Sequence, residues 1–280
     1  MASQEGRVLI LFVASKKDIA AMNIAEKLVK GQGFKRAEET FCGNPVFSKT
    51  LAEGGTAKLI YVDQDSVNTQ ELSFPSPLRL LVFLSRHKSL SGTPTLSVHT
   101  PGNLGDAELG GLPRTVSISP ASAMREALKA MKEAQVEKGL EYEVSYECTH
   151  HGPSLNVPTM FVELGSSEKQ WQDQEAAEAV ARAALAAAAA DTVDYAVLGV
   201  GGPHYNMKFT RKALETETAF GHIIPKYAVS KIDTEILRQC VAKTVEPVKK
   251  AVLDWKGITG ADKSRLLRLL AEVGLEVEKI

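Results

Sequence analysis

Short apolar runs alternate with amphipathic stretches along most of the chain. The runs at residues 7–14 and 57–62 are largely apolar, as in buried strands, and residues 18–30 carry apolar side chains at helical spacing. The same reasoning predicts further strands at residues 78–85, 95–99, 142–148, 159–164, 195–200 and 275–278. It predicts further helices at residues 119–138, from residue 167 through the alanine tract near 190, and at residues 261–273.

Strands that alternate with helices are typical of an α/β protein. The strands between residues 78 and 118 lie too close together for crossover helices, which favours a mixed sheet. We therefore expect a mixed, twisted sheet flanked by helices on both faces. No long linker marks a boundary, so residues 1–280 are predicted to form a single domain, or one with a smaller subdomain around residues 86–160. The Gly/Pro-rich segment 100–113 is either a boundary or a long active-site loop.

The composition excludes several classes of protein. With 280 residues, 44% hydrophobic and 24% charged, the chain can bury a core and is neither disordered nor a disulfide scaffold. No apolar run approaches the roughly 20 residues that span a bilayer, and the apolar run near the start fits a buried strand better than a secretory signal. The missing spanning run predicts that the protein has no membrane partner. The three cysteines (Cys42, Cys148 and Cys240) form no CxxC motif and cannot all pair, which predicts a reducing, cytoplasmic location.

The charge of the chain is balanced overall but uneven locally. Lys plus Arg is 33 and Asp plus Glu is 34, a net charge of −1 that argues against a protein coating DNA. Residues 204–231 nevertheless carry five basic and two acidic residues, and residues 243–268 carry seven and three. These segments are either solvated helix faces or contacts for nucleic-acid phosphates.

Six histidines are the most informative polar residues. Most of them follow a predicted strand or lie in a Gly/Pro-rich turn. Because sites in open α/β sheets form beyond the carboxyl ends of strands, we expect at least three to converge on one site. The alternative is that each stabilises its own loop. The histidines are His87, His99, His150, His151, His204 and His222.

The segment at residues 146–153 is the densest cluster of reactive side chains. If its strand continues, Glu147 and His151 share one face while Cys148 and His150 share the other. The Gly-Pro pair that follows would end the strand and could expose both imidazole rings. The histidines, with Glu147 and Glu163, could supply ligands for one or two zinc sites, although the spacing matches no compact metal motif. Cys148 is either a thiol nucleophile beside His150 or, as we favour, a small buried hydrophobe.

A glycine-rich turn follows the predicted strand 195–200. A dinucleotide-binding motif that began at Gly199 would need a third glycine where the chain has His204, so we exclude this function. The consecutive glycines Gly201 and Gly202 could still form a backbone nest for an anion or a carbonyl oxygen.

Several long strings resemble the archaeal and plant type of D-aminoacyl-tRNA deacylase. They are SRHKSLSGTPTLSVHTPGNLG (85–105), YECTHHGPSLNVPTMFVELGSSEKQW (146–171), VGGPHYNMKFTRKAL (200–214), FGHIIPKYA (220–228) and DWKG (254–257). The resemblance runs in order across essentially the whole chain. One departure is Pro203, which stands where the family usually has a third glycine, and which would stiffen the loop that carries His204.

The resemblance implies a catalytic domain that hydrolyses the ester between a D-amino acid and the terminal ribose of tRNA, a chiral proofreading step in translation. It also implies zinc, and an α/β fold similar to purine nucleoside phosphorylases and peptidyl-tRNA hydrolases. The implied partner is the acceptor end of D-aminoacyl-tRNA, bound by a cytoplasmic monomer. Two alternatives remain: a non-catalytic RNA-binding module and a nucleoside phosphorylase-like enzyme.

On this resemblance, the candidate site residues fall into three groups. The catalytic group is His150, His151 and Glu147, and the metal-binding group is His87, His99, His204, His222 and Glu163, with either glutamate as ligand or base. The substrate-binding group is Arg86, Gly201, Gly202, Tyr205, Lys208, Arg211, Lys212 and Lys226, with the basic residues of 243–268 farther down the tRNA stem.

Overall fold

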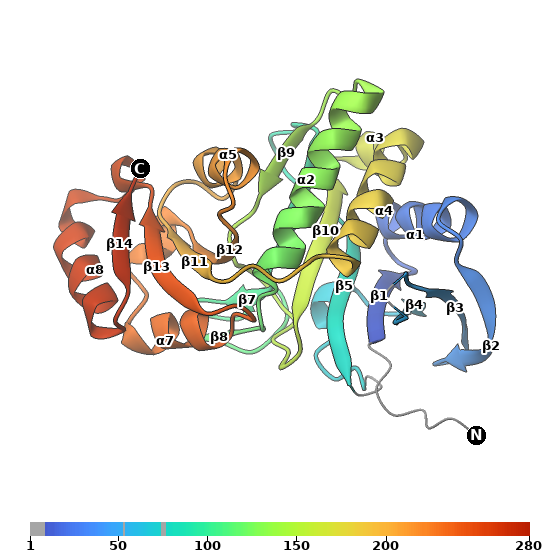
Figure 1. The fold of residues 1–280 in the computed structure, drawn as a ribbon, viewed down its shortest axis with the longest axis horizontal. Helices are drawn as coiled ribbons and strands as arrows, with labels where there is room; N and C mark the ends of the chain where they lie inside the picture. Colours follow the sequence, from blue (N-terminus) through green and yellow to red (C-terminus); the bar gives the residue numbers. More distant parts are fainter. Residues whose placement is uncertain (1–8, 53, 74–76) are drawn as a thin grey trace.

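The computed structural model describes residues 9–52, 54–73 and 77–280. In it, the apolar runs near the two ends of the chain form strands of two separate sheets (Figure 1). Within these residues, the larger sheet has eight strands in the order β2-β3-β4-β1-β5-β10-β6-β9. The central strands β4, β1, β5 and β10 are parallel, whereas β6 is antiparallel to β10, so the predicted mixed sheet is confirmed. The strands are β1 (Leu9–Ser15), β2 (Lys35–Phe41), β3 (Asn44–Thr50), β4 (Thr56–Val62), β5 (Leu78–Arg86), β6 (Thr95–His99), β9 (Glu143–Tyr146) and β10 (Thr159–Gly165).

The smaller sheet has four parallel strands in the order β12-β11-β13-β14, and β7 pairs with β8 in a short ribbon. These strands are β7 (Gly102–Asn103), β8 (Thr115–Val116), β11 (Ala196–Val200), β12 (Phe220–Ile224), β13 (Val248–Leu253) and β14 (Glu276–Lys279). The helices are α1 (Ile19–Gly31), α2 (Ala121–Lys138), α3 (Glu168–Trp171), α4 (Gln174–Ala188), α5 (Met207–Glu215), α6 (Lys226–Val229), α7 (Thr234–Ala242) and α8 (Gly260–Glu272). No helix in the described residues is long and apolar enough to cross a lipid bilayer.

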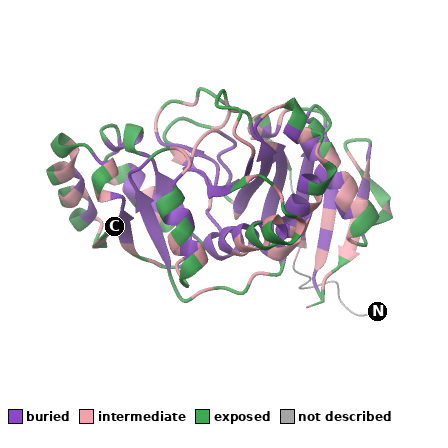
Figure 2. Cartoon of the chain, turned by 90° about the horizontal axis from the view of Figure 1, so that it is seen from above, coloured by how far each residue is buried: buried purple, intermediate pink, exposed green. Residues whose placement is uncertain are grey.

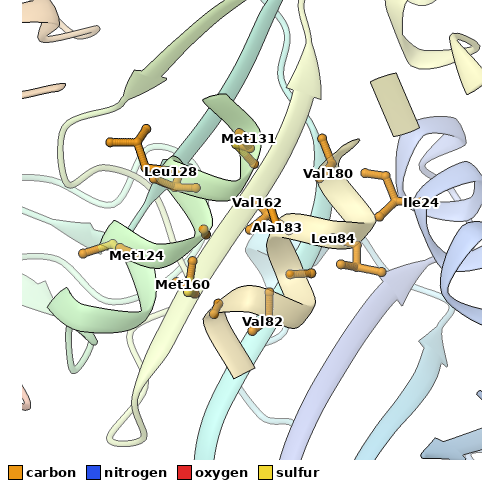
Figure 3. Packing of buried hydrophobic residues seen from close by; sticks show 14 of the residues in the cluster. Ile24, Val82, Leu84, Met124, Leu128, Met131, Met160, Val162, Val180 and Ala183 are labelled. Atoms are coloured by element: carbon orange, nitrogen blue, oxygen red, sulfur yellow. The ribbon is translucent and has the colours of Figure 1, made fainter. Parts of the chain in front are cut away.

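Helices cover one face of the larger sheet. Figure 3 shows Met124 and Leu128 of α2 and Val180 of α4 packed over Val82 and Met160 of the sheet. The small side chains of the alanine tract let α2 and α4 pack closely against each other and the sheet. Figure 2 shows the result: buried strands lie behind helices whose outer faces are exposed.

The opposite face of the larger sheet is covered by loops rather than helices. There, sheet residues such as Phe83 and Phe161 pack against Leu155 and Val157, which lie outside helices and strands. The smaller sheet has helices on both faces, with α5 on one side and α7 and α8 on the other. The predicted α/β fold with a mixed sheet flanked by helices is confirmed, but in the described residues the helices of the larger sheet lie on one face and not on both, as we had expected. The loop-covered face of the larger sheet is where the candidate site lies.

Helix α2 connects the two sheets. Pro120 precedes the helix, and the carboxylate of Glu246 accepts the first two backbone N–H groups, from Ala121 and Ser122, at 3.0 and 2.9 Å. Ser119 also exchanges backbone hydrogen bonds with Lys243 and Val245. Because residues 243–246 precede β13 directly, these contacts fix the smaller sheet relative to the larger one.

Three details differ from the predicted elements. The long helix predicted from residue 167 is two helices, because Asp173 caps α4 with its side chain and ends the preceding turn. The strand predicted at 142–148 ends at Tyr146. The predicted first strand begins at Leu9 in the structure, and the earlier residues of that prediction lie outside the described ranges.

Candidate active site

Five of the six histidines converge on one centre. His150 lies in the middle, with its ring centroid 4.3 Å from that of His99, 4.2 Å from His151 and 4.4 Å from His204. The ring of His87 lies 6.5 Å from that of His204. The expectation that at least three histidines converge is confirmed, and the residues come from four separate segments of the chain.

The centre lies over the loop-covered face of the larger sheet. His99 is paired in register with Phe161, and Ser97 with Glu163, so these side chains point to one face. The His99 ring stacks on Phe161 with a centroid distance of 5.0 Å. Because β6 is antiparallel to β10, the histidines do not share one carboxyl edge, as our argument from strand ends assumed. Instead they meet across the face of the sheet.

Two buried carboxylates hold one side of the centre. His204 Nε2 donates to Glu147 Oε2 at 2.8 Å, and Ser97 Oγ donates to Glu147 Oε1. His87 Nδ1 lies 3.2 Å from Glu147 and 3.3 Å from Glu163. His87 and His204 thus have carboxylate partners, and we refer to them as the carboxylate-held pair.

These contacts shift the pKa of each partner. Burial alone would lower the pKa of His87, but hydrogen bonds to Glu147 and Glu163 raise it to about 10. Burial likewise opposes the charged form of His204, but hydrogen bonds with Cys148 and Glu147 raise its pKa to about 10. Burial would raise the pKa of Glu147, yet the hydrogen bonds from His204 and His87 hold it well below its usual value. At neutral pH this side of the centre holds two imidazolium cations between ionised carboxylates.

Backbone carbonyls hold the other side of the centre. His150 Nδ1 donates to the carbonyl of Cys148 at 2.8 Å, and His151 Nδ1 donates to the carbonyl of Gly152 at 2.6 Å. Each bond places the proton on Nδ1 and leaves an unshared electron pair on Nε2. Burial lowers the pKa of His150 well below its usual value and that of His151 to about 4. We refer to these neutral imidazoles as the carbonyl-held pair.

The donor atoms form three groups that could hold a metal ion. They are His99, His150 and His151; Cys148, His150 and His204; and His87, Glu147 and Glu163, with the ligand atoms of each group within 4.8 Å of one another. Both ring nitrogens of His99 are buried without a hydrogen-bond partner in the described residues. Unsatisfied buried nitrogens are rare, and His99 shares the first group with the two imidazoles of the carbonyl-held pair.

A cavity of about 530 Å³ opens beside the carbonyl-held pair. Its volume falls within the roughly 300–1,000 Å³ range typical of small-molecule sites. His150 and His151 form part of its wall, and α6 and the loop that follows β7 supply most of the rest. The Gly/Pro-rich segment 100–113 therefore lines the site, as expected for an active-site loop.

The predicted strand alternation around Glu147 is wrong. The chain leaves the extended conformation after Tyr146, and His151 adopts a positive φ of 40°. The rings of His150 and His151 consequently lie side by side on one centre rather than on opposite faces of a strand. Cys148 is buried, as favoured, and its Sγ lies 3.2 Å from His204 Nδ1.

The glycine turn after β11 serves to place His204 and Tyr205. Gly202 has φ +76°, and a Cβ there would lie 2.3 Å from the side-chain nitrogen of Asn206, which caps α5. The N–H of Gly201 is donated to the carbonyl of Ile224, so that group is not available to a nest. The hydroxyl of Tyr205 makes a short hydrogen bond to His87 Nε2, which brings the turn onto the carboxylate-held pair.

His222 is the one histidine outside the centre. It lies within β12 and is fully buried, with Nδ1 3.1 Å from the hydroxyl of Thr149 and Nε2 donating to the carbonyl of Lys243. Burial lowers its pKa to about 4. With both nitrogens engaged, His222 offers no free electron pair, so the structure does not place it with the predicted metal ligands.

The predicted substrate-binding cations lie in different surroundings. Lys208 pairs with Asp254 and Lys212 with Glu278, both at 2.6 Å, whereas Arg211 and Lys226 are exposed without an ion pair in the described residues. The guanidinium of Arg86 lies 5.5 Å from the centre of the Trp171 ring, beside α3.

The sequence reasoning missed Tyr227 as a candidate. Tyr227 is the second residue of α6, and it lines the cavity. Its hydroxyl lies 3.3 Å from both Cys148 Sγ and His204 Nδ1. The string FGHIIPKYA, which carried part of the family resemblance, includes this tyrosine, and that was the available signal.

Comparisons with known proteins agree with the resemblance. Residues 74–278 match the family model described as D-aminoacyl-tRNA deacylase. The D-aminoacyl-tRNA deacylase of Thermococcus onnurineus is 39% identical over 95% of this chain and 98% of its own length, and that of Methanosarcina acetivorans is 37% identical over 96% and 92%. A crystal structure of a conserved protein of unknown function covers 98% of this chain and 95% of its own, with a TM-score of 0.83 and 29% identity. The chain therefore belongs to the D-aminoacyl-tRNA deacylase family.

Proposed function

We propose that the five-histidine centre hydrolyses the ester bond of D-aminoacyl-tRNA, releasing the free D-amino acid and tRNA. The observation that carries this proposal is the carbonyl-held pair, which presents two neutral imidazoles to a cavity in a chain of this family. A non-catalytic RNA-binding module would have no use for five converging imidazoles, and it is not favoured.

The reaction needs a centre that activates water. Water adds through its oxygen to the ester carbonyl carbon and loses a proton, the C–O bond to the ribose then breaks, and the ribose oxygen takes up a proton. The Nε2 electron pairs of His150 and His151 can accept the proton from water, or they can bind a metal ion that activates the same water. Both roles need a neutral imidazole, which burial secures here.

The carboxylate-held pair supplies fixed positive charge. A tetrahedral intermediate carries a negative oxygen, and cations already in place stabilise it without reorganisation. His204 lies next to His150, with ring centroids 4.4 Å apart, and Glu147 holds its ring in position. We assign His204 and His87 to this electrostatic role, and Tyr205 to orienting His87.

Zinc forms part of the proposal because the donor set suits it. His99 has two buried nitrogens without hydrogen-bond partners in the described residues, and with His150 and His151 it brings three imidazoles together. These three residues would hold the zinc ion, which would lower the pKa of a bound water to about 7.

The remaining assignments concern the partner. We propose that two exposed cations, Lys226 beside the cavity-lining Tyr227 and Arg211 on α5, contact the phosphates of the acceptor end. The proposal further includes a cytoplasmic monomer that acts on no DNA, and sedimentation of the purified protein would test the oligomeric state.

A deacylation assay on matched D- and L-aminoacyl-tRNAs, with and without chelator, tests the function. We expect the D-ester to be hydrolysed far faster than the L-ester and at a rate independent of phosphate. Equal rates, or no hydrolysis of either, would refute the proposal. If chelator abolishes activity and zinc restores it, the Nε2 electron pairs bind the metal ion. If activity is full with chelator, the Nε2 electron pairs accept the proton from water.

A further inference from the structure

The side chain of Tyr227 has its hydroxyl inside and its ring exposed, the reverse of the usual orientation of a partly exposed tyrosine. Such residues usually bury the ring and leave the hydroxyl in water. Here the side chain is 56% exposed, yet the hydroxyl lies 3.3 Å from both Cys148 Sγ and His204 Nδ1 inside the centre. The polar end is anchored and an apolar surface faces solvent, which costs free energy unless a ligand covers it.

The exposed surface of Tyr227 belongs to the cavity beside the carbonyl-held pair. Leu109, 63% exposed, lines the same cavity from the loop that follows β7. Lys226 and Lys231 lie at the start of α6 and just beyond it, both exposed and without an ion pair in the described residues. Of these two lysines only Lys231 lines the cavity, and Lys226 precedes Tyr227 in the chain. The wall around Tyr227 therefore combines an aromatic ring, an aliphatic side chain and a cation without an ion pair in the described residues, together with the carboxylates of Asp106 and Glu108.

The exposed aromatic ring and the nearby lysines suit the end of a single-stranded nucleic acid. Unpaired bases stack on aromatic side chains, and lysines contact the phosphates that follow. The 3′-terminal nucleotide of every tRNA is an unpaired adenosine, and its ribose carries the aminoacyl ester. A ribose bound in the cavity would lie between Tyr227 and the two histidines His150 and His151, which line it too.

We propose that the ring of Tyr227 is the platform on which the terminal adenine of the substrate stacks, so that the ester reaches the carbonyl-held pair. This inference rests on the proposed function. The anchored hydroxyl fixes the ring relative to His204 before substrate arrives, so the base locates the ester with little ordering on binding. Tyr227 is accordingly a substrate-binding residue, and the enzyme reads the nucleoside as well as the amino acid.

The test compares two substrates: D-aminoacyl-tRNA, and the same ester on a tRNA whose terminal adenine has been removed. For the unmodified protein we expect kcat/KM to be roughly 5- to 150-fold lower without the base, the range for one aromatic–base stack. Tyr227→Leu should lower kcat/KM by a similar factor with the intact substrate, mainly through KM, and should abolish the difference between the substrates. Tyr227→Trp should retain that difference.

Two controls separate stacking from a structural role. Tyr195→Leu removes another partly exposed tyrosine, 39% exposed and absent from the residues that line the cavity, and should leave both substrates unaffected. If Tyr227→Leu slows both substrates equally, the residue is structural and the proposal is wrong. Equal kcat/KM of the unmodified protein with and without the base overturns it even if no variant folds. Failure to hydrolyse either D-ester would instead refute the proposed function itself.

Discussion

The histidines on the two sides of the centre have the same side chain and opposite surroundings. Backbone carbonyls hold His150 and His151, and burial keeps both rings neutral. Buried carboxylates hold His87 and His204, and the pKa of each is raised to about 10. Depth of burial does not explain the difference, since burial alone lowers the pKa in all four cases. The partner on the ring nitrogen determines which imidazole carries charge.

This difference divides the chemistry within one small volume. Neutral rings offer electron pairs to a water proton or a metal, and charged rings offer stabilisation to a developing oxyanion. The arrangement therefore predicts that substitutions on the two sides have different consequences.

Removing a neutral imidazole should have the largest effect. His150→Ala and His151→Asn, the latter chosen because asparagine tolerates a positive φ, should each reduce kcat by about 10²–10⁴ with little change in melting temperature. Deacylation rate and thermal unfolding would be measured on the same samples. His222→Gln is the matched control, a buried histidine outside the centre, and it should keep kcat. Wild-type kcat in either of the first two variants would show that the carbonyl-held pair is structural.

His222 provides a second way to sharpen the comparison, through stability. Its pKa is about 4 in the folded protein, below the ordinary 6.5, so the neutral form stabilises the fold. The contribution is complete above pH 6.5 and is lost as the pH falls toward 4, by about 3 kcal/mol or roughly 100-fold in the unfolding equilibrium. Urea unfolding at pH 7 and pH 4 would measure it. His222→Gln should lose correspondingly less stability over this range, and an identical loss would contradict the prediction.

Neutralising the carboxylate between the charged rings should have an intermediate effect. Glu147→Gln keeps the shape of the side chain but removes its negative charge and one of the two oxygens that accept from His87 and His204, and we expect deacylation to fall by about 10- to 100-fold. Glu163→Gln removes one of the two carboxylates beside His87 and leaves His204 paired, so its loss should be smaller. Steady-state kinetics of both variants would rank them. A greater loss in Glu163→Gln would mean that His204 is not the important cation.

Substitutions in the basic segment of α5 should have the smallest effect, and they should act on tRNA binding. Lys208 and Lys212 already pair with Asp254 and Glu278, which leaves Arg211 as the free cation of the three in the described residues. Changing all three to Ala should flatten the salt dependence of tRNA binding by about one unit of slope, as Arg211→Ala alone should. Binding titrations at several salt concentrations would test this. A decrease near three units would show that the ion pairs open on tRNA, and an unchanged slope would show a solvated face.

The predictable part of the fold is the part whose strands are buried on both sides. The continuous apolar runs of β1, β4, β5 and β10 are readily recognised, and each lies within a residue or two of its predicted position. The hairpin of β2 and β3 was not predicted because its residues are mostly polar and few of them are buried. Strands β12 and β13 were missed because β12 is short and interrupted by Gly221 and His222, and β13 carries two lysines directly after its first residue.

The sequence allowed us to predict most of the residues of the site but not how they are arranged. Histidines placed after strands indicated that they would converge, and five of six do. The division of four of these histidines into two pairs depends on whether a ring nitrogen bonds to a backbone carbonyl or to a carboxylate. Ser97, Glu147 and Glu163 come together beside the rings only because β6 pairs antiparallel with β10. The left-handed backbone at His151 likewise has no signal in the residue type.

The contacts at the start of α2 have a consequence for how the protein unfolds. The carboxylate that caps this helix comes from Glu246, on the segment that leads into the smaller sheet, while the helix packs on the larger one. Separating the sheets would strip the first turn of α2 of its acceptor and expose two backbone N–H groups. We infer that the two sheets melt in a single cooperative transition. His204 and Glu147, which follow strands of different sheets, would then lose their contact only when the whole fold is lost.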